Sequence, residues 1–369
     1  MTEYIQKKCV RMRFLTPVHI SDGYEGELIP TEYVITSSGM LHKIDLGKLI
    51  GLLPENSFDN LNVYIENEDL IGIKNFIKLL WQEREDLFSD CIEYLMHAGD
   101  LEAYYSNMQN ESQASQLIVT PFIRTGKRTF LPGSSVKGAI RTAFINELLK
   151  PSIEFSLLDG GIDNKAKKLE AYTLKYSDKD PKKRREINLE KDPFKALKIS
   201  DAAIPVGNST VRKIEIVKKD KSGKFDITQM KETKIFGEFI DKGMELDLEA
   251  RLDSRYFGSP RSIGMEVSFD KIINSSKAFY KRVLTHEKDA FFSDFDKQVG
   301  KSKISQLYDD LLKLNDSQDT FVLRIGRHIG RNSISFNLIN KKGIEPKSRN
   351  LIIENGEYWP VGWICATVI

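Results

Sequence analysis

Two short segments of the chain combine glycines, hydroxyl side chains and cations at spacings that suit an anion. The first reads LPGSSVKGAIRTAF, residues 131–144. Pro132 and Gly133 break the preceding element, and the apolar-periodic run after them predicts a helix that begins near Ser134 and ends at about Leu149. A helix N-terminus offers unpaired N–H groups and a partial positive charge, so this turn could hold a phosphate group.

The side chains of this segment strengthen the prediction. Ser134 and Ser135 are both natural N-cap residues, and Gly133 would let a ligand approach the backbone closely. Lys137 and Arg141 are four residues apart and share one helical face, next to an expected buried stripe of Val136, Ile140, Phe144 and Leu148. The plainer alternative is a well-capped amphipathic helix whose two cations are solvated.

Nucleoside triphosphate binding does not fit this segment. Gly133 and Gly138 have the spacing of a P-loop, but Ala139 and Ile140 follow where that motif has Lys and Ser or Thr. The sequence also contains no G-x-G-x-x-G motif. A phosphate of a nucleic-acid backbone is therefore the better candidate ligand.

The second segment reads LRIGRHIGRNSISFN, residues 323–337. Glycines allow positive φ angles, so successive N–H groups can line a concave anion site, and arginines add bidentate phosphate contacts. The alternative is a tight turn between strands with exposed arginines. The residues that carry the prediction are Arg324, Gly326, Arg327, His328, Gly330 and Arg331.

A basic turn, RTGKRTF, comes just before the first segment. Its cations, Arg124, Lys127 and Arg128, would extend a positive surface along a nucleic-acid backbone, or they form an ordinary exposed hairpin turn. Nearby phenylalanines could stack on bases, although core packing is the simpler interpretation for each of them: Phe122, Phe130, Phe236 and Phe257.

No catalytic site, metal site or cofactor is predicted. His19 and His42 lie in or beside strand-like segments, but neither has a second histidine or tyrosine placed beside it by the sequence, and a lone histidine is more often structural. There is no H-E-x-x-H motif and no His/Cys cluster with metal-ligand spacing. Asp201 is interpreted as a turn or capping residue.

The composition describes an ordinary globular chain. It has 369 residues, 40% apolar and 29% charged, with a net charge of +2, so nucleic-acid binding must come from clustered charge rather than from the total. Cys9, Cys91 and Cys365 stand far apart, which argues against a disulfide framework and a structural zinc site and suits a reducing cytosol. With no secretory signal and no long apolar run, we expect a cytoplasmic protein without membrane contact.

Periodicity predicts a mixture of strands and helices in both halves of the chain, and hence an α+β fold with mostly antiparallel sheets. Residues 70–81 follow a helical pattern, which we expect to continue to about Tyr105. Residues 165–191 carry ten Lys/Arg and five Asp/Glu, which predicts a solvated loop or an arm that orders on a polyanion. A first strand is expected from residue 10 to Pro17, and two short strands around a Ser-Ser-Gly turn are expected within residues 32–46. Further strands are expected in residues 117–124, 197–204, 211–219, 244–252, 320–326 and 361–369, and helices in 275–295 and 304–315.

The pairing of LPGSSVKGAIRTAF with a late glycine-rich loop resembles the RAMP superfamily of CRISPR-associated RNA-binding proteins. Further segments in the same order narrow the resemblance to the subunit that ends the backbone of type III-A (Csm) effector complexes. These segments are LTPVHISDG, YVITSSGMLHKIDL, DPFKALKISDAAI and GEFIDKGMELDLEARL. Within the first of them, Ser21 and Asp22 stand where a small Gly/Ser pair is expected. The resemblance also implies that Asp22 is the nearest acidic candidate for RNA cleavage.

The resemblance implies two ferredoxin-like (RRM-like) modules with a helical insertion. The first would span residues 1–195, with the insertion at about 55–118 and a mobile basic loop at about 160–192. The second would span 196–369 and carry the Gly/Arg-rich loop 324–332.

The resemblance also implies a non-catalytic subunit that binds the 3′ portion of a CRISPR RNA. Such a subunit would cap the backbone filament, support guide maturation and antiviral defence, and contact neighbouring Csm subunits and host ribonucleases. Two alternatives are a metal-independent guide-processing endoribonuclease that uses His19 or His42, and an adaptor that touches RNA only in the assembly. The predicted RNA-binding residues are Gly133, Ser134, Ser135, Lys137, Arg141, Arg124, Arg128, Arg324, Gly326, Arg327, His328, Gly330 and Arg331.

Overall fold

Alternating apolar residues form an antiparallel sheet that holds segments from both ends of the chain. In its central strand, Met12 and Phe14 point into the core while Arg11 and Arg13 are exposed. The computed structural model describes residues 4–21, 23, 26–107, 117–149, 162–176, 189–226, 234–257, 265–334 and 345–369. From edge to edge the sheet contains β14 (Thr320–Arg324), β17 (Trp363–Val368), β1 (Ile5–Phe14), β13 (Glu245–Asp253) and β8 (Leu197–Ile199).

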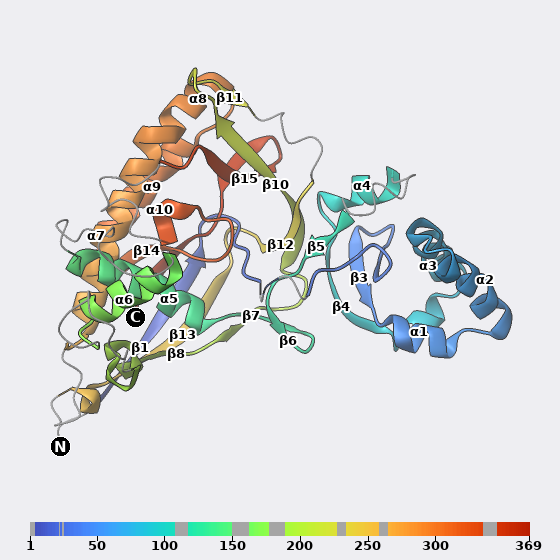
Figure 1. The fold of residues 1–369 in the computed structure, drawn as a ribbon, viewed down its shortest axis with the longest axis horizontal. Coiled ribbons are helices and arrows are strands. Elements are labelled where there is room, and N and C mark those ends of the chain that lie inside the picture. Colours follow the sequence, from blue (N-terminus) through green and yellow to red (C-terminus); the bar gives the residue numbers. More distant parts are fainter. Residues whose placement is uncertain are drawn as a thin grey trace.

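Two helices, α5 (Gly133–Leu148) and α7 (Phe269–Glu287), pack against each other and against this sheet (Figure 1). Their apolar faces meet strand residues in the main core, with Val136 and Ile140 on α5 and Ile272 on α7. The Ser268 hydroxyl caps α7 by accepting from the Lys271 N–H at 3.3 Å. Beyond α7 the chain makes a π-helical turn (Lys288–Phe292) and then forms α8 (Ser293–Val299) and α9 (Ile304–Asn315).

A second sheet is built around the long strand β10 (Ser209–Lys219). The first half of β10 pairs with β12 (Phe236–Ile240), and the second half pairs with β15 (Ser348–Glu354). The other strands of this sheet are β2 (Tyr33–Ile35), β3 (Met40–Ile44), β4 (Ile92–His97), β5 (Val119–Thr120), β11 (Phe225–Asp226) and β16 (Glu357–Pro360). A small third sheet joins β6 (Arg124–Thr125), β7 (Arg128–Leu131) and β9 (Ala202–Ala203).

The expected strands fall on strands of these sheets, although the one expected at 117–124 is reduced to β5 and β6. The helix expected at 304–315 is α9, and the one expected at 275–295 belongs to a longer helical segment that starts at Phe269. The mixed α+β class with several sheets is confirmed. Strands from both sides of residue 195 share each of the two large sheets, so the predicted module boundary does not separate one sheet from the other.

The helical lobe at the end of the molecule far from α7 contains α1 (Leu46–Leu52), α2 (Glu55–Glu66) and α3 (Leu70–Glu83) (Figure 1). The expected continuation of helix to Tyr105 is wrong. A 3₁₀ turn (Glu85–Phe88) ends the helical run, and Ile92–His97 becomes β4, which pairs with β3. This pairing is non-local and overrides the local pattern. Helix resumes only at α4 (Leu101–Asn107).

The polar stretch is also more ordered than predicted. Helix α6 (Ile162–Thr173) occupies the beginning of the expected loop 160–192, and its residues Leu169 and Ala171 are buried in the main core. Two 3₁₀ turns, Leu189–Lys191 and Pro193–Ala196, end the segment. Widely spaced apolar residues among many charges were enough to anchor the helix. Residues 177–188, also part of the expected loop, lie outside the described residues.

Candidate nucleic-acid interface

The two segments singled out in the sequence meet at one cleft of about 670 Å³. The helix α5, the loop that follows β14 and the segment after β1 form its walls. None of the described residues that line the cleft is Asp or Glu; Asp22 lies outside the described residues. The lining residues with hydroxyl groups, the glycines and the arginine of the loop include Ser21, Ser135, Gly138, Thr142, Gly326 and Arg327.

Helix α5 presents only small side chains to the cleft. Ser135, Gly138 and Thr142 are three and four residues apart, so they lie on one helical face. Gly138 is exposed, and the Thr142 hydroxyl donates back to its carbonyl at 3.0 Å. This wall therefore leaves room for a bulky ligand to lie against the helix backbone.

The opposite wall is a tight loop held against the segment after β1. Gly326 has φ +92°, and a Cβ atom there would lie 2.2 Å from the carbonyl oxygen of His19. The Arg327 N–H donates to the same oxygen at 2.7 Å. The Arg327 guanidinium also donates to the Ser21 hydroxyl at 3.4 Å, which holds its charge at the cleft.

The start of α5 differs from the prediction that Ser134 or Ser135 caps it. The helix begins at Gly133 with Pro132 at the cap position and no side-chain cap bond. The Gly133 N–H donates instead to the Asp201 carboxylate at 2.8 Å, which confirms Asp201 as a capping residue. Gly133 is buried, and a Cβ atom there would lie 2.2 Å from the Ile199 carbonyl oxygen, so its role is close packing rather than close approach of a ligand.

The two predicted cations of α5 bond to the protein itself and are not simply solvated. The Lys137 ammonium donates to the Leu197 carbonyl at 2.7 Å, and burial lowers the pKa of this amine. The Arg141 guanidinium pairs with Glu170 at 2.5 Å and Asp192 at 2.8 Å. Both side chains therefore bind α5 to neighbouring parts of the chain, namely Leu197 on β8, Glu170 on α6 and Asp192. The sequence of α5 alone does not predict these partners.

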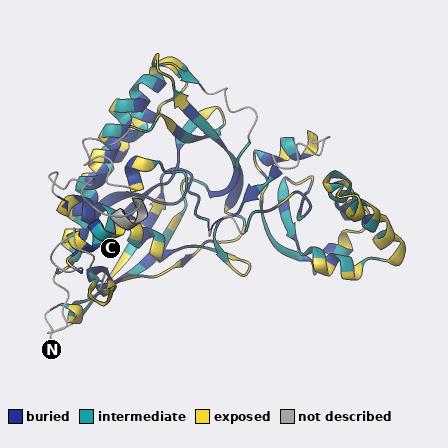
Figure 2. Cartoon of the chain, viewed as in Figure 1, coloured by how far each residue is buried: buried dark blue, intermediate teal, exposed yellow. Residues whose placement is uncertain are grey.

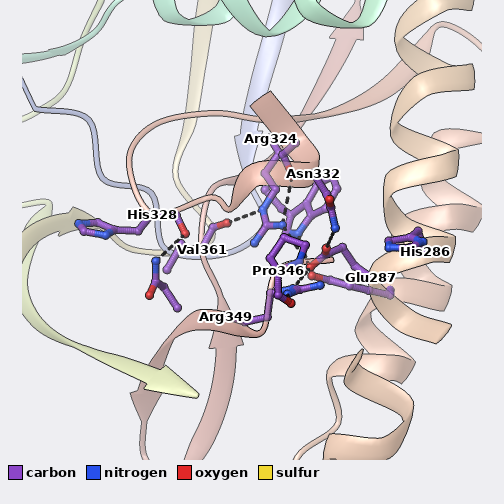
Figure 3. A network of polar contacts seen from close by, with 12 residues as sticks. His286, Glu287, Arg324, His328, Asn332, Pro346, Arg349 and Val361 are labelled. Atoms are coloured by element: carbon purple, nitrogen blue, oxygen red, sulfur yellow. Dashed lines mark hydrogen bonds and ion pairs between the residues drawn. The ribbon is translucent and has the colours of Figure 1, made fainter. Parts of the chain in front are cut away.

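Arg324 lies in a buried polar network beneath the loop (Figure 3). Only 3% exposed, it is not the exposed cation that was expected. Its guanidinium donates to the Val361 carbonyl at 3.0 Å and to the Ser333 hydroxyl at 3.3 Å. Next to it, Glu287 pairs with Arg349 at 2.6 Å and accepts from the Asn332 amide at 2.7 Å. Arg324 thus positions the loop and the short helix α10 (Arg331–Ile334).

Arg124 is likewise engaged inside the protein. It pairs with the fully buried Glu238 and lies 3.5 Å from the centre of the Tyr94 ring. Glu238 also accepts from the Ser209 hydroxyl at 2.6 Å and from the Phe122 N–H at 2.7 Å. Arg124 is therefore not the surface cation that was predicted.

In the rest of the basic turn, Arg128 is exposed, and the Lys127 ammonium donates to the Ile92 carbonyl at 2.9 Å. Core packing is confirmed for Phe122, Phe236 and Phe257, and Phe130 is half-buried.

Comparison with known proteins decides the family. The sequence profile of the RAMP superfamily matches residues 11–333. The chain belongs to the RAMP superfamily. Within it, the chain resembles Csm5 of type III-A CRISPR complexes: a Methanocaldococcus jannaschii protein named CRISPR system Cms protein Csm5 is 27% identical over 209 residues, 52% of this chain and 42% of that protein. The match therefore spans less than half the length of that relative.

Two solved structures share the fold of this RAMP protein. One is a chain of the cryo-EM structure of a Csm–crRNA–target RNA ternary complex in a type III-A CRISPR-Cas system, with a TM-score of 0.60, 21% identity, and 99% and 100% of the two chains covered. The other is the crystal structure of T. onnurineus Csm5, with a TM-score of 0.61, 21% identity, and 96% and 99% covered.

The histidines that a RAMP nuclease would use are poorly placed to meet a substrate. His19 is fully buried, and its Nδ1 lies 2.7 Å from the Glu238 carbonyl oxygen. Its ring stacks on His328 with centroids 5.9 Å apart, and His42 packs on Trp81 with centroids 4.8 Å apart. Within the described ranges, no group of His, Cys, Asp and Glu could hold a metal ion, and no helix has the length and apolar character to cross a bilayer.

The His19–His328 pair predicts acid sensitivity. Burial lowers the pKa of each histidine to about 4, helped at both by the positive charge of Arg327. Below pH 6.5 the unfolded chain takes up protons that the folded chain does not, so stability falls as the pH drops from 6.5 towards 4. Each histidine lowers the free energy of unfolding in acid by about 1.4 kcal/mol for each unit by which its pKa is shifted.

Urea denaturation at pH 7, 6, 5 and 4.5 measures this loss. Residue 328 has φ +67°, and asparagine tolerates that conformation, so His328→Asn should reduce the acid-induced loss without adding strain. The exposed His97→Asn is the matched control. An acid-induced loss that is identical in the wild type and in His328→Asn would contradict the prediction.

Proposed function

We propose that this RAMP protein is a non-catalytic CRISPR RNA-binding subunit of a type III-A Csm complex. It would cap the backbone filament at the 3′ end of the guide and support guide maturation and antiviral defence. The observation that carries the proposal is the cleft at which both sequence segments meet. The Arg327 guanidinium is held there by the Ser21 hydroxyl, and the described lining contains no carboxylate. Its proposed partners are the 3′ portion of the CRISPR RNA, neighbouring Csm subunits and host ribonucleases.

The relatives support this proposal. The Csm5 relative and the chain of the Csm–crRNA–target RNA complex share sequence or fold with it. In chain order, and with other elements inserted between them, β1, α5, β8, β13, α7 and β17 follow the β-α-β-β-α-β pattern of a ferredoxin-like module. Their strands also lie in the order of such a module, β17–β1–β13–β8. We propose that this module is one of the two expected.

The cleft also divides the predicted RNA-binding residues into two roles. Ser135, Gly326 and Arg327 line the cleft and are proposed to contact the RNA backbone. Arg324 also lines the cleft, but it is 3% exposed and bonds to Val361 and Ser333, which favours a positioning role. Contacts from the remaining predicted residues stay predictions. Close packing at Gly133, and the bonds of Lys137, Arg141 and Arg124 within the protein, favour positioning over direct contact. The remaining residues are Gly133, Ser134, Lys137, Arg141, Arg124, Arg128, His328, Gly330 and Arg331.

Replacement of Arg327 by glutamine tests the site. Loss of one phosphate contact should weaken binding across RNA sequences and lower the slope of log affinity against log salt by about one. The measurement is a titration of labelled CRISPR RNA at several salt concentrations, with aliquots run on a denaturing gel. Arg255→Gln, which removes an exposed arginine paired with Asp253, is the control.

Two results would contradict the proposal in different ways. An Arg327→Gln variant with wild-type affinity and salt slope would overturn the proposed site. Discrete RNA fragments from the wild-type protein would favour the endoribonuclease alternative.

A Lys137→Met and Arg141→Met double variant should bind CRISPR RNA more weakly and also melt at a lower temperature, because both cations bond to the protein.

A further inference from the structure

The lobe of α1, α2 and α3 has an electrostatic character opposite to that of the rest of the chain. Residues 46–92 contain nine Asp or Glu and four Lys or Arg, whereas the whole chain has a net charge of +2. Between Lys48 and Lys74 there are five carboxylates and no cation. This surface repels the phosphates of RNA, so the proposed RNA-binding function does not account for it.

Helix α2 arranges these charges beside exposed apolar side chains. Phe58 and Ile65 are seven residues apart and therefore share a face, and they are 40% and 43% exposed. Glu55, Asp59 and Glu66 form the neighbouring face and are all exposed. Helix α2 has no basic residue to compensate them, and like charges four residues apart destabilise a helix.

The packing of the lobe leaves Phe58 and Ile65 partly exposed. Leu61, three residues after Phe58 and four before Ile65, is the residue of this helix that is buried, and the exposed pair flanks it. The Tyr64 ring lies so close to α3 that a Cβ atom on Gly72 would be 2.2 Å from it. The Asp69 carboxylate caps α3 by accepting from the Gly72 N–H at 2.7 Å. These contacts hold the hairpin of α2 and α3 and leave Phe58 and Ile65 40% and 43% exposed.

Exposed apolar side chains are concentrated in this lobe. Figure 2 shows exposed residues along the outer side of α1 and α2. Six of the fifteen exposed large apolar residues in the described ranges lie here, in less than a fifth of the chain, and such clusters mark surfaces that bind other proteins. They are Leu52, Phe58, Val63, Ile65, Leu70 and Leu79.

We propose that the α2 face formed by Phe58, Ile65, Glu55, Asp59 and Glu66 docks a neighbouring protein subunit of the Csm complex. The contacting surface of that subunit is apolar and surrounded by Lys and Arg. The apolar pair supplies the buried centre of the contact, and the carboxylates select a basic partner and exclude RNA. This inference rests on the proposed function, because the Csm complex supplies the partner.

The test measures pairwise binding of the full-length protein to each other purified subunit of its Csm complex, at low and high salt. One variant carries Phe58→Ser and Ile65→Ser, and the other carries Glu55→Lys and Asp59→Lys. All four residues lie at the surface, and the melting temperature of each variant shows whether the lobe stays folded. Val206→Ser and Glu357→Lys change an exposed apolar and an exposed acidic residue elsewhere and are the matched controls.

Each double variant should bind one subunit roughly tenfold more weakly or worse, and wild-type binding to that subunit should weaken with salt. CRISPR RNA affinity should not fall in either variant. Wild-type affinity for every subunit would overturn the docking site but leave the Arg327 result intact. Loss of self-association alone would also overturn it, because the occupant would then be a second copy. If the wild-type protein bound a subunit through this face but did not bind CRISPR RNA, the docking site would stand and the proposed RNA-binding function would fail.

Discussion

Glu287→Ala should destabilise the protein by about 3–5 kcal/mol, because it removes the buried carboxylate that compensates two buried arginines. Glu287 is 2% exposed and bonds to the Arg349 guanidinium at 2.6 Å, with the Arg324 guanidinium 3.9 Å away. It also accepts from the Asn332 amide. Its removal therefore affects both the stability of the main core and the position of the loop that lines the cleft.

Urea denaturation measures this loss, and Glu345→Ala is the matched control. Glu345 pairs with the same Arg349 at 2.7 Å, but its side chain is 46% exposed, and an exposed pair contributes roughly 1 kcal/mol or less. We expect the Glu287 variant to lose several times more stability than the Glu345 variant and to bind CRISPR RNA more weakly. Equal losses in the two variants would show that the buried network is not what holds the loop.

This network marks the limit of what the sequence could predict. Periodicity and glycine spacing located both walls of the cleft, because those signals are local. They gave no sign that Arg324 would be buried, since its partners lie on α7 and on the chain around Val361 and Ser333. An arginine beside a glycine suits a phosphate or a buried carboxylate equally well, and only the tertiary structure separates the two.

The same reasoning explains the errors in the fold. Residues 92–97 form strand β4 because β3 lies beside them, and this non-local pairing leaves no signal in the local pattern. Helix α6 was missed because its many charges suggested a loop, although Glu170 on α6 pairs with Arg141 on α5. The strands β14 and β17 were predictable because their apolar runs are short and bounded by turn residues.

Gly326→Ala should nearly abolish RNA binding and destabilise the protein. Two costs combine at this position. A non-glycine residue at φ +92° is strained by about 1–3 kcal/mol. The new methyl group would also lie 2.2 Å from the carbonyl oxygen of His19, and overpacking of this kind typically costs about 1–3 kcal/mol more.

Gly330→Ala separates these two costs. Gly330 has a similar φ of +82°, but a Cβ atom there has nothing within 4 Å, so only the strain applies. The Gly326 variant should therefore have the lower free energy of unfolding. It should also lose more RNA affinity, because the His19 carbonyl that the methyl group displaces accepts from the Arg327 N–H. If the two variants proved equally stable and bound RNA equally well, the contact between the loop and the segment after β1 would not define the cleft, and the RNA would have to lie elsewhere.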